Sequence, residues 1–377
     1  MNFLKAERAV LDALLPGLDA ELSRIALLDM EREGNPSLEV FRRMRGPGLV
    51  VPFEYGGLGA SMLQAVRVQR AIGSRAPSLA VATTMHHFSA AAIVDASRIR
   101  TQPGLEAMLL GRIATENLYL ASAFAEGKVG GDIFAPELRV ERGVEGLRVT
   151  GTKKPCSLST SMDILTTSLL VPSEDGGSPQ FALAVIPANT PGIECRPFWE
   201  SSILAGAESN EVILTDVFVP NMSIAYLGDP ATLDQARIDG FLAFELLITA
   251  TYLGIASSLI ETVLRQVRGT ADDRAAMSME LEASMAAIEG LAIQAETDEN
   301  SQELVAKALF VRRSTQSSIC RATDLAVEVL GGMSFIRDPA TAYLLAASRA
   351  LAFHPPTRGS STAALDAYIS GDELVLS

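Results

Sequence analysis

Residues 121–136 read ASAFAEGKVGGDIFAP, and they separate two different kinds of sequence. Before them, residues 1–117 are rich in Ala and Leu at helical spacing; after them, residues 138–220 are rich in Val, Ile, Thr and Gly at strand spacing. The stretch contains Gly130 and Gly131, and glycine lets backbone N–H groups approach a ligand closely because no Cβ stands in the way. Taken alone, such a loop is typical of a turn, so its role depends on the sequence around it.

The overall composition favours some classes of protein and excludes others. A chain of 377 residues favours two or three lobes, and 48% hydrophobic residues exclude an intrinsically disordered chain. The net charge of −14 argues against a nucleic-acid partner, because binding phosphates needs a basic face. Three Cys and three His show neither disulfide-like nor zinc-like spacing, which fits a reducing cytoplasm and predicts no metal site.

Two segments bear on targeting and membranes. Residues 1–16 carry several charges, so we expect no cleaved signal peptide. Residues 241–260 are long enough to span a bilayer, but Glu245 lies within them, and a charge at that depth costs a few kcal/mol. The sequence therefore favours a core helix of an α-helical bundle, and no membrane partner.

Helical periodicity dominates both ends of the chain. Residues 3–31 carry Leu at three- and four-residue steps, which predicts an amphipathic helix, and residues 78–97 read as an Ala-rich helix. His86 and His87 are adjacent in that helix, so they point to different faces, and we expect packed or partly solvated side chains rather than metal ligands. After residue 231 long helical segments joined by short turns predict an antiparallel bundle. The expected bundle helices are 232–267, 273–297, 301–330, 339–352 and 362–370.

The middle of the chain reads as short strands. Residues 210–218 alternate polar and apolar side chains and stop before Pro220. Several antiparallel strands at this spacing predict a small barrel or sandwich. The candidate strands are 118–124, 137–141, 146–151, 164–171, 180–186 and 210–218. We therefore predict an α+β fold with an N-terminal α-helical domain (1–117), a middle β domain (118–228) and a C-terminal helical bundle (229–377).

Five spaced motifs resemble those of the acyl-CoA dehydrogenase superfamily. Residues 51–59 (VPFEYGGLG) are similar to its P-x-x-Y-G-G-x-G loop, and residues 125–132 (AEGKVGGD) to its flavin loop T-E-P-x-x-G-S-D. Residues 151–157 (GTKKPCS) resemble the G-x-K-x-W-I-T strand that follows. Residues 216–220 (DVFVP) match the end of its β domain, and residues 328–332 (EVLGG) its Q-x-L-G-G motif. The resemblance covers most of the chain and implies an N-terminal helical domain, a middle β-barrel and a C-terminal four-helix bundle.

The resemblance implies bound FAD. In the family, backbone atoms at the positions of Phe124 and Ala125 contact the isoalloxazine ring, and Ser157 stands where a Thr places its hydroxyl near N5. The flavin carries the redox chemistry, while the protein binds, orients and tunes it. Ala125 replaces a family Thr, and Pro155 a Trp, so the resemblance implies an altered flavin site. Further cofactor contacts are implied at Gly130, Gly131, Glu328, Gly332, Ser360 and Thr362.

The usual family reaction needs a carboxylate that removes an α-proton while a hydride passes to flavin N5. The Glu that most members carry in an E-G-T motif is here Arg358, which stays protonated and cannot act as a base. The alternative family position, on the first bundle helix, is here Phe244; Glu245 is its neighbour, about 100° further round the helix. We interpret Glu245 as the candidate base or, alternatively, as a member of an ion pair with Arg358. His354 is a further candidate base.

The leading functional prediction is an FAD-dependent dehydrogenase that desaturates an acyl thioester carried on CoA or on a carrier protein. The resemblance also implies a homodimer or homotetramer and either an electron-transfer partner or oxygen as acceptor. The divergent site favours an enzyme of secondary metabolism. Two alternatives remain: a flavin monooxygenase of the same fold, which needs no carboxylate base, and a non-catalytic relative.

Overall fold

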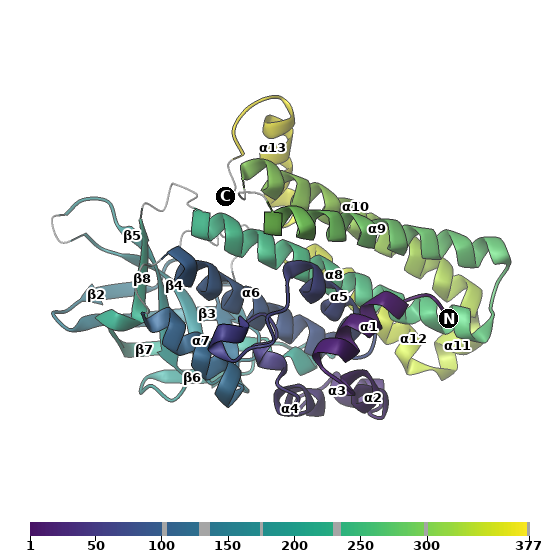
Figure 1. Ribbon diagram of the computed structural model, residues 1–377, viewed down its shortest axis with the longest axis horizontal. Coiled ribbons are helices and arrows are strands. Elements are labelled where there is room, and N and C mark those ends of the chain that lie inside the picture. The colour runs from purple at the N-terminus through teal and green to yellow at the C-terminus, as the bar shows by residue number, and fades with distance from the viewer. Residues whose placement is uncertain (100–103, 128–135, 174–175, 229–234, 298–300, 375–377) are drawn as a thin grey trace.

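The structure is a computed structural model that describes residues 1–99, 104–127, 136–173, 176–228, 235–297 and 301–374 (Figure 1). Helices come first along the chain, strands second and long helices last. The strands lie at one end of the molecule, and the long helices extend away from them (Figure 1). This arrangement confirms the predicted α+β fold. The three domain boundaries stay a prediction, since N-terminal helices pack directly on the first bundle helix.

The N-terminal segment forms short helices instead of the single helix predicted over residues 3–31. The chain breaks at Pro16 and Gly17, because proline lacks the N–H of a helical bond and Gly17 adopts a φ of 85°. The prediction of one helix is therefore wrong at this point. The helices of this region are α1 (Lys5–Leu14), α2 (Leu18–Ser23), α3 (Leu27–Met30), α4 (Pro36–Arg43), α5 (Met62–Gly73), α6 (Pro77–Ile99) and α7 (Leu105–Glu116), with short 3-10 turns η1 (Gly46–Gly48) and η2 (Phe53–Tyr55).

The described strands form two four-stranded sheets. They are β1 (Leu120–Ala123), β2 (Arg139–Arg142), β3 (Gly146–Cys156), β4 (Ile164–Val171), β5 (Gln180–Pro187), β6 (Ile193–Arg196), β7 (Asn210–Pro220) and β8 (Ile224–Gly228). One sheet has the order β1-β4-β5-β8, and only its β1–β4 pair is parallel; the other has the order β2-β3-β7-β6 and is antiparallel. Two further 3-10 turns, η3 (Ala205–Ala207) and η4 (Asn221–Ser223), precede β7 and β8.

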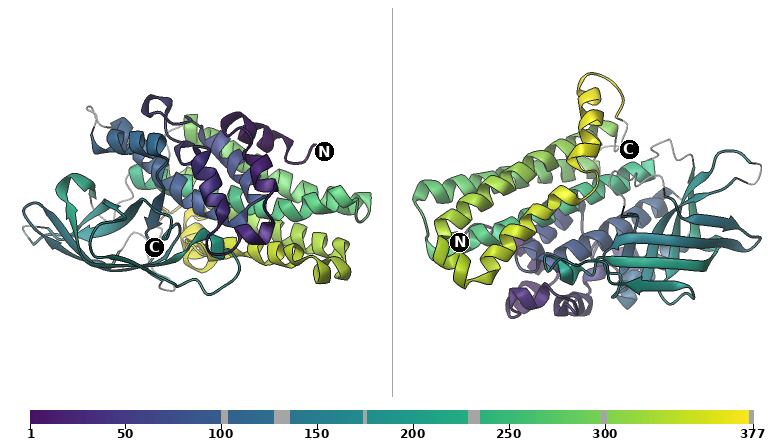
Figure 2. Two further views of the ribbon diagram at one scale, coloured as in Figure 1. Left: turned by 90° about the horizontal axis from the view of Figure 1, so that it is seen from below. Right: turned by 180° about the vertical axis from the view of Figure 1, so that it is seen from behind.

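The C-terminal bundle is built from α8 (Gln235–Gln266), α9 (Ala271–Thr297), α10 (Gln302–Leu330) and α12 (Pro339–Ser348). α8 lies at its centre and also packs against α5 and α6 (Figure 2). In the described part of the chain, one segment, Arg237–Gln266, is long and apolar enough to cross a membrane, but 94% of its apolar window is buried in the protein. It is thus the core helix that the sequence favoured. α11 (Gly332–Arg337), η5 (Arg349–Phe353) and α13 (Arg358–Ile369) complete this region.

Two glycines let α8 approach α5 closely. A Cβ on Gly254 would lie 2.3 Å from the carbonyl oxygen of Arg70, and a Cβ on Gly73 would lie 2.5 Å from that of Thr251. Larger residues would force the two backbones apart. This crossing fixes the part of α8 that faces α6 and the end of β1, where the candidate site lies.

Candidate functional site

Five ring-bearing side chains form a continuous row where the end of β1, α6, α8 and the segment after η5 meet. We call this set the aromatic cluster; it consists of Phe88, Phe124, Phe244, His354 and Tyr252. Ring centroids are 5.9 Å apart for Phe88–Phe124, 5.4 Å for Phe88–Phe244, 6.3 Å for Phe244–His354 and 5.3 Å for Tyr252–His354. All but Tyr252 are only half-buried, whereas most of the neighbouring helix positions are buried. Partly open rings contributed by several segments are typical of a small-molecule site.

The segment that carries Phe124 is held against β3. The amide of Lys154 donates to the carbonyl of Ala125 at 2.8 Å, and Nζ of the buried Lys153 donates to Oε1 of Glu126 at 2.7 Å. Burial lowers the pKa of Lys153, although the Glu126 carboxylate opposes that shift. These contacts place the backbone at Phe124 and Ala125 beside the strand.

Ser157 directly follows β3, and its hydroxyl is largely buried. Its Oγ lies 2.9 Å from Oγ of Ser209, which precedes β7. Ser157 is three residues beyond Lys154, hence no more than about 10 Å along the chain from the Ala125 contact. Ser157 thus lies at the end of the strand that holds Phe124 and Ala125, and its contact with a flavin stays a prediction.

Glu245 is held in a buried ion pair. Its Oε1 accepts a hydrogen bond from Nη1 of Arg312 at 2.6 Å, and both side chains are fully buried between α8 and α10. Burial raises the pKa of Glu245, while the charge of Arg312 opposes the shift. The ion-pair alternative is thus the one that the structure shows, but the expected partner Arg358 was wrong. Phe244, about 100° round the helix, lies in the cluster.

Arg358 is the first residue of α13, and its side chain is exposed. The hydroxyls of Ser360 and Thr362 donate to the carbonyls of Thr357 and Arg358, respectively. Both predicted cofactor hydroxyls are therefore used locally at the start of the helix. Their contact with a flavin stays a prediction.

The remaining predicted cofactor residues lie elsewhere. Glu328, in the last turn of α10, and Gly332, at the start of α11, are exposed. α11 lies at the end of the bundle opposite the strands (Figure 1). Within one chain the structure does not bring these two residues to the aromatic cluster. Gly130 and Gly131 lie outside the described residues.

His354 is held from two sides. Its Nε2 lies 2.8 Å from the hydroxyl of the buried Tyr252, and its carbonyl accepts a hydrogen bond from Nη2 of Arg312 at 2.5 Å. Burial, reinforced by the positive charge of Arg312, lowers the pKa of His354 to about 3. A ring with so low a pKa is a poor general base near neutral pH. This disfavours the role of substitute base that the sequence suggested.

The residues around the aromatic cluster fit a flat ring system. Phe88, Phe124 and Phe244 give half-exposed apolar walls. Apolar walls with few polar groups suit an isoalloxazine ring, which supplies redox chemistry when bound.

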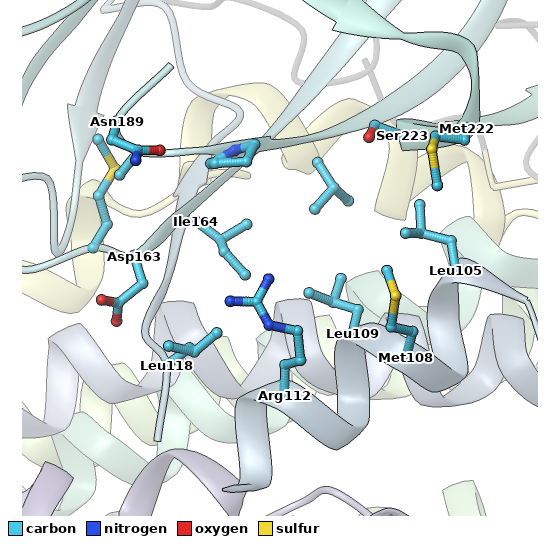
Figure 3. Close-up of a pocket in the computed structure, with 14 residues that line it drawn as sticks. Leu105, Met108, Leu109, Arg112, Leu118, Asp163, Ile164, Asn189, Met222 and Ser223 are labelled. Atoms are coloured by element: carbon cyan, nitrogen blue, oxygen red, sulfur yellow. The ribbon is translucent and has the colours of Figure 1, made fainter. Parts of the chain in front are cut away.

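A cavity of about 490 Å³ lies between α7 and the β1-β4-β5-β8 sheet, away from the aromatic cluster (Figure 3). Arg112 points into it from α7, and its guanidinium is already bound to Glu116 at 2.8 and 2.9 Å. Met108 and Met222 also line it and are largely exposed. No member of the aromatic cluster lines this cavity, so the two sites are distinct.

The chain is similar in sequence to known proteins along almost its whole length. No family model matches the chain. It is 45% identical over 379 residues to isobutylamine N-hydroxylase from Streptomyces viridifaciens, across 99% of this chain and 100% of that protein. It is 23% identical over 337 residues to YngJ, a probable acyl-CoA dehydrogenase of Bacillus subtilis, across 82% of this chain and 83% of that protein. The chain belongs to the acyl-CoA dehydrogenase superfamily.

A solved structure shows the same superfamily fold. FMN-bound TdsC from Paenibacillus sp. A11-2 matches with a TM-score of 0.85 over 98% of both chains, at 16% identity. That level of identity supports the shared fold and no more. It agrees with the predicted order of helical, β and bundle regions.

The predicted acyl thioester dehydrogenase activity is wrong for this member of the acyl-CoA dehydrogenase superfamily. Its 45% identical relative is an N-hydroxylase, matched over 99% of this chain. The structure gives a physical reason, because neither family base position presents a carboxylate: position 244 is Phe, and position 358 is an exposed Arg. These findings support a flavin-dependent oxidoreductase, but neither an acyl thioester substrate nor FAD in particular.

Sequence reasoning missed Phe88, Tyr252 and Arg312. A signal for Arg312 was present, because it falls on the apolar stripe of α10 together with Leu309 and Ile319. A cation on a buried stripe requires a buried anion, and Glu245 was the isolated charge in the apolar stretch of α8. Phe88 and Tyr252 carried no comparable signal, because aromatic residues in helices are most often core residues.

Proposed function

We propose that this protein is a flavin-dependent oxygenase that hydroxylates the nitrogen of a small aliphatic primary amine. Its 45% identity over the full length of isobutylamine N-hydroxylase supports this substrate class. The observation that carries the proposal is the ion pair of Glu245 with Arg312, which engages the acidic side chain nearest to a family base position. Oxygenation of nitrogen requires no removal of a carbon-bound proton, so the loss of the family base is compatible with it.

The proposed reaction balances with one reductant. The amine RNH₂, O₂, two electrons and two protons give the hydroxylamine RNHOH and water. An N–O bond forms with one oxygen atom, the O–O bond breaks, and the second oxygen leaves as water. Reduced flavin supplies the electrons and protons, and a separate reductase regenerates it.

The chain's own residues bind and select the amine. The half-exposed rings of Phe88 and Phe244 contact the alkyl group and exclude water. An apolar environment disfavours the ammonium ion, and the neutral amine carries the lone pair that the reaction needs. The site therefore takes the uncharged form of the substrate.

The identity of the flavin and the oligomeric state are linked in this proposal. Glu328 and Gly332 lie at the opposite end of the molecule from the strands, so they reach a flavin at the aromatic cluster only from a second copy of the chain (Figure 1). We propose FAD held by a homo-oligomer in this way. Competition between FAD and FMN for the protein, with sedimentation analysis of the same sample, tests this step. Equal affinities in a monomer would contradict it.

An activity assay tests the proposed function itself. Purified protein is mixed with flavin, a flavin reductase, NADPH and primary amines of increasing chain length, and hydroxylamine formation is measured. We expect product with small branched or linear amines. Under the same conditions but without oxygen, a saturated acyl-CoA should not reduce the flavin; reduction by acyl-CoA alone would contradict the proposal.

A further inference from the structure

Arg312 binds more of the chain than an ion pair requires. Nη1 donates to Oε1 of Glu245 at 2.6 Å and to the carbonyl of Pro355 at 3.2 Å. Nη2 donates to the carbonyls of Leu351 at 3.2 Å and His354 at 2.5 Å. One fully buried guanidinium thus joins α8, α10 and three carbonyls of the segment 351–355.

Such a buried charge pair is seldom retained for stability alone. Taking two charges out of water is unfavourable, and well-packed apolar residues of similar volume are often as stable. The carbonyls of an irregular buried segment, however, need hydrogen-bond donors. Arg312 supplies donors to three of them, so its role is to order the segment that carries His354.

Tyr252 fixes the ring of the same residue. Its hydroxyl is buried and lies 2.8 Å from Nε2 of His354. A buried hydroxyl proton needs an acceptor, so we assign donation from Tyr252 to Nε2, which places the imidazole proton on Nδ1. Tyr252 is seven residues after Glu245, two turns along α8, so both residues face the same side of that helix.

We propose that Arg312 and Tyr252 are positioning residues that present Nδ1–H of His354 as a hydrogen-bond donor at the aromatic cluster. Arg312 fixes the main chain of His354, and Tyr252 fixes its ring. The group that touches the bound ligand is His354. The positioning stands on the contacts above, and only its consequence for catalysis rests on the proposed function.

Nitrogen NMR of labelled histidine tests the positioning without flavin or amine. The chain has three His, and His86 gives an internal reference, because its Nδ1 accepts from Leu120 N at 3.0 Å and its Nε2 donates to Pro47 O at 2.8 Å. We expect His86 as the Nε2–H tautomer and His354 as the Nδ1–H tautomer. Substitution H354Q assigns the signals.

Three variants then separate the contributions. Tyr252→Phe removes only the hydroxyl and should convert His354 to a mixture of tautomers. Arg312→Lys keeps the positive charge but loses the planar guanidinium with its several N–H donors. It should broaden or double the His354 signals, while those of His86 stay unchanged. A single loss of Arg312 would leave Glu245 buried and unpaired, so the double variant E245Q/R312Q provides a form without either charge. It should disorder His354 as well.

The outcomes distinguish the two proposals. If His354 keeps its wild-type tautomer and linewidth in both Tyr252→Phe and E245Q/R312Q, the proposed positioning of His354 is overturned. This holds whether or not the protein makes hydroxylamine. If the signals change as expected but the wild-type protein makes no hydroxylamine, the positioning stands and the proposed function fails. If both stand, Tyr252→Phe should lower hydroxylamine formed per NADPH several-fold, with peroxide released instead and little change in the amine KM. Arg321→Gln, on the same helix but paired with Glu280 at the surface, should leave unchanged both the His354 signals and the hydroxylamine formed per NADPH.

Discussion

Oε1 of Glu245 and Nη1 of Arg312 are joined by a 2.6 Å hydrogen bond inside the helical bundle, and neither side chain is exposed. This contact engages the acidic side chain that lies nearest to a family base position. It also provides the cation that orders the segment around His354. One ion pair therefore engages the only acidic side chain beside a family base position in α8 and also holds the segment that carries His354.

Breaking this pair should destabilise the fold. Glu245→Ala leaves Arg312 charged and unpaired, and we expect the free energy of unfolding to fall by about 3–5 kcal/mol. The double variant E245Q/R312Q should lose less than the sum of the losses in Glu245→Gln and Arg312→Gln, because no unpaired charge remains buried, although the carbonyls of Leu351, His354 and Pro355 still lose their donors. Urea denaturation of these variants, with the exposed pair Arg321–Glu280 as control, measures this; removal of the control pair should cost no more than about 1 kcal/mol. Losses of the two single variants that simply add up to the loss of the double variant would contradict this view.

Glu31 should make stability depend on pH. Its carboxylate is buried and accepts hydrogen bonds from Ser78 Oγ at 2.6 Å and Tyr343 OH at 2.5 Å. Burial raises its pKa from 4.5 to about 7. The folded protein therefore binds more protons than the unfolded chain between these values, so the free energy of unfolding should fall by roughly 3 kcal/mol as pH rises from 4.5 to about 7 and change little above that.

Denaturation at pH 5, 6, 7 and 8 checks the role of Glu31. Glu31→Gln cannot ionise and should remove this part of the pH dependence. The exposed Glu54 gives a control, since Glu54→Gln should leave the pH dependence of stability unchanged. A pH dependence that is the same in Glu31→Gln and the wild type would show that Glu31 does not carry the effect.

Phe244 should limit the size of the substrate. Its half-buried ring lies between Phe88 and His354 in the aromatic cluster. Phe244→Ala opens space for a larger alkyl group, so the ratio of kcat/KM for a six-carbon amine to that for a four-carbon amine should rise about tenfold, equivalent to roughly 1.4 kcal/mol. Steady-state kinetics with amines of graded length measure the ratio. An unchanged ratio would place the substrate elsewhere.

Ser157 should contribute to flavin binding. Loss of one hydroxyl contact is worth about 1 kcal/mol, so Ser157→Ala should weaken binding of FMN about fivefold. Thr362→Ala is the control, because its hydroxyl donates to the carbonyl of Arg358 within α13. Fluorescence quenching of FMN measures both constants. A larger effect of Thr362→Ala than of Ser157→Ala would refute this placement of the ring.

The fold could be predicted because its signals are local and repeated. Helical spacing, strand alternation and several spaced motifs each depend on nearby residues, and they agreed on one order of elements. The single helix predicted over residues 3–31 rested only on the helical spacing of Leu residues, and that prediction was wrong. The Leu spacing continues through Pro16 and Gly17, but the backbone turns there. The backbone preferences of proline and glycine therefore decided the structure at that point, and the spacing of apolar residues did not.

The site was harder to predict from the sequence, because its contacts join residues that are far apart in the chain. Glu245 and Arg312 are 67 positions apart, and Tyr252 and His354 are 102 apart. Family motifs located position 358 but gave no partner for Glu245, so Arg358 was the wrong choice. Charge complementarity between two buried helix stripes would have indicated Arg312, whereas the hydrogen bond of His354 required the folded chain.

Oxygen labelling of the product tests the proposed oxygenase most directly. The protein is given reduced flavin and isobutylamine, then ¹⁸O₂, and the hydroxylamine is analysed by mass spectrometry. We expect one ¹⁸O atom in N-isobutylhydroxylamine, with its yield reduced several-fold in Tyr252→Phe. The proposal would be contradicted by an absence of labelled hydroxylamine when the protein binds flavin and the reduced flavin is consumed.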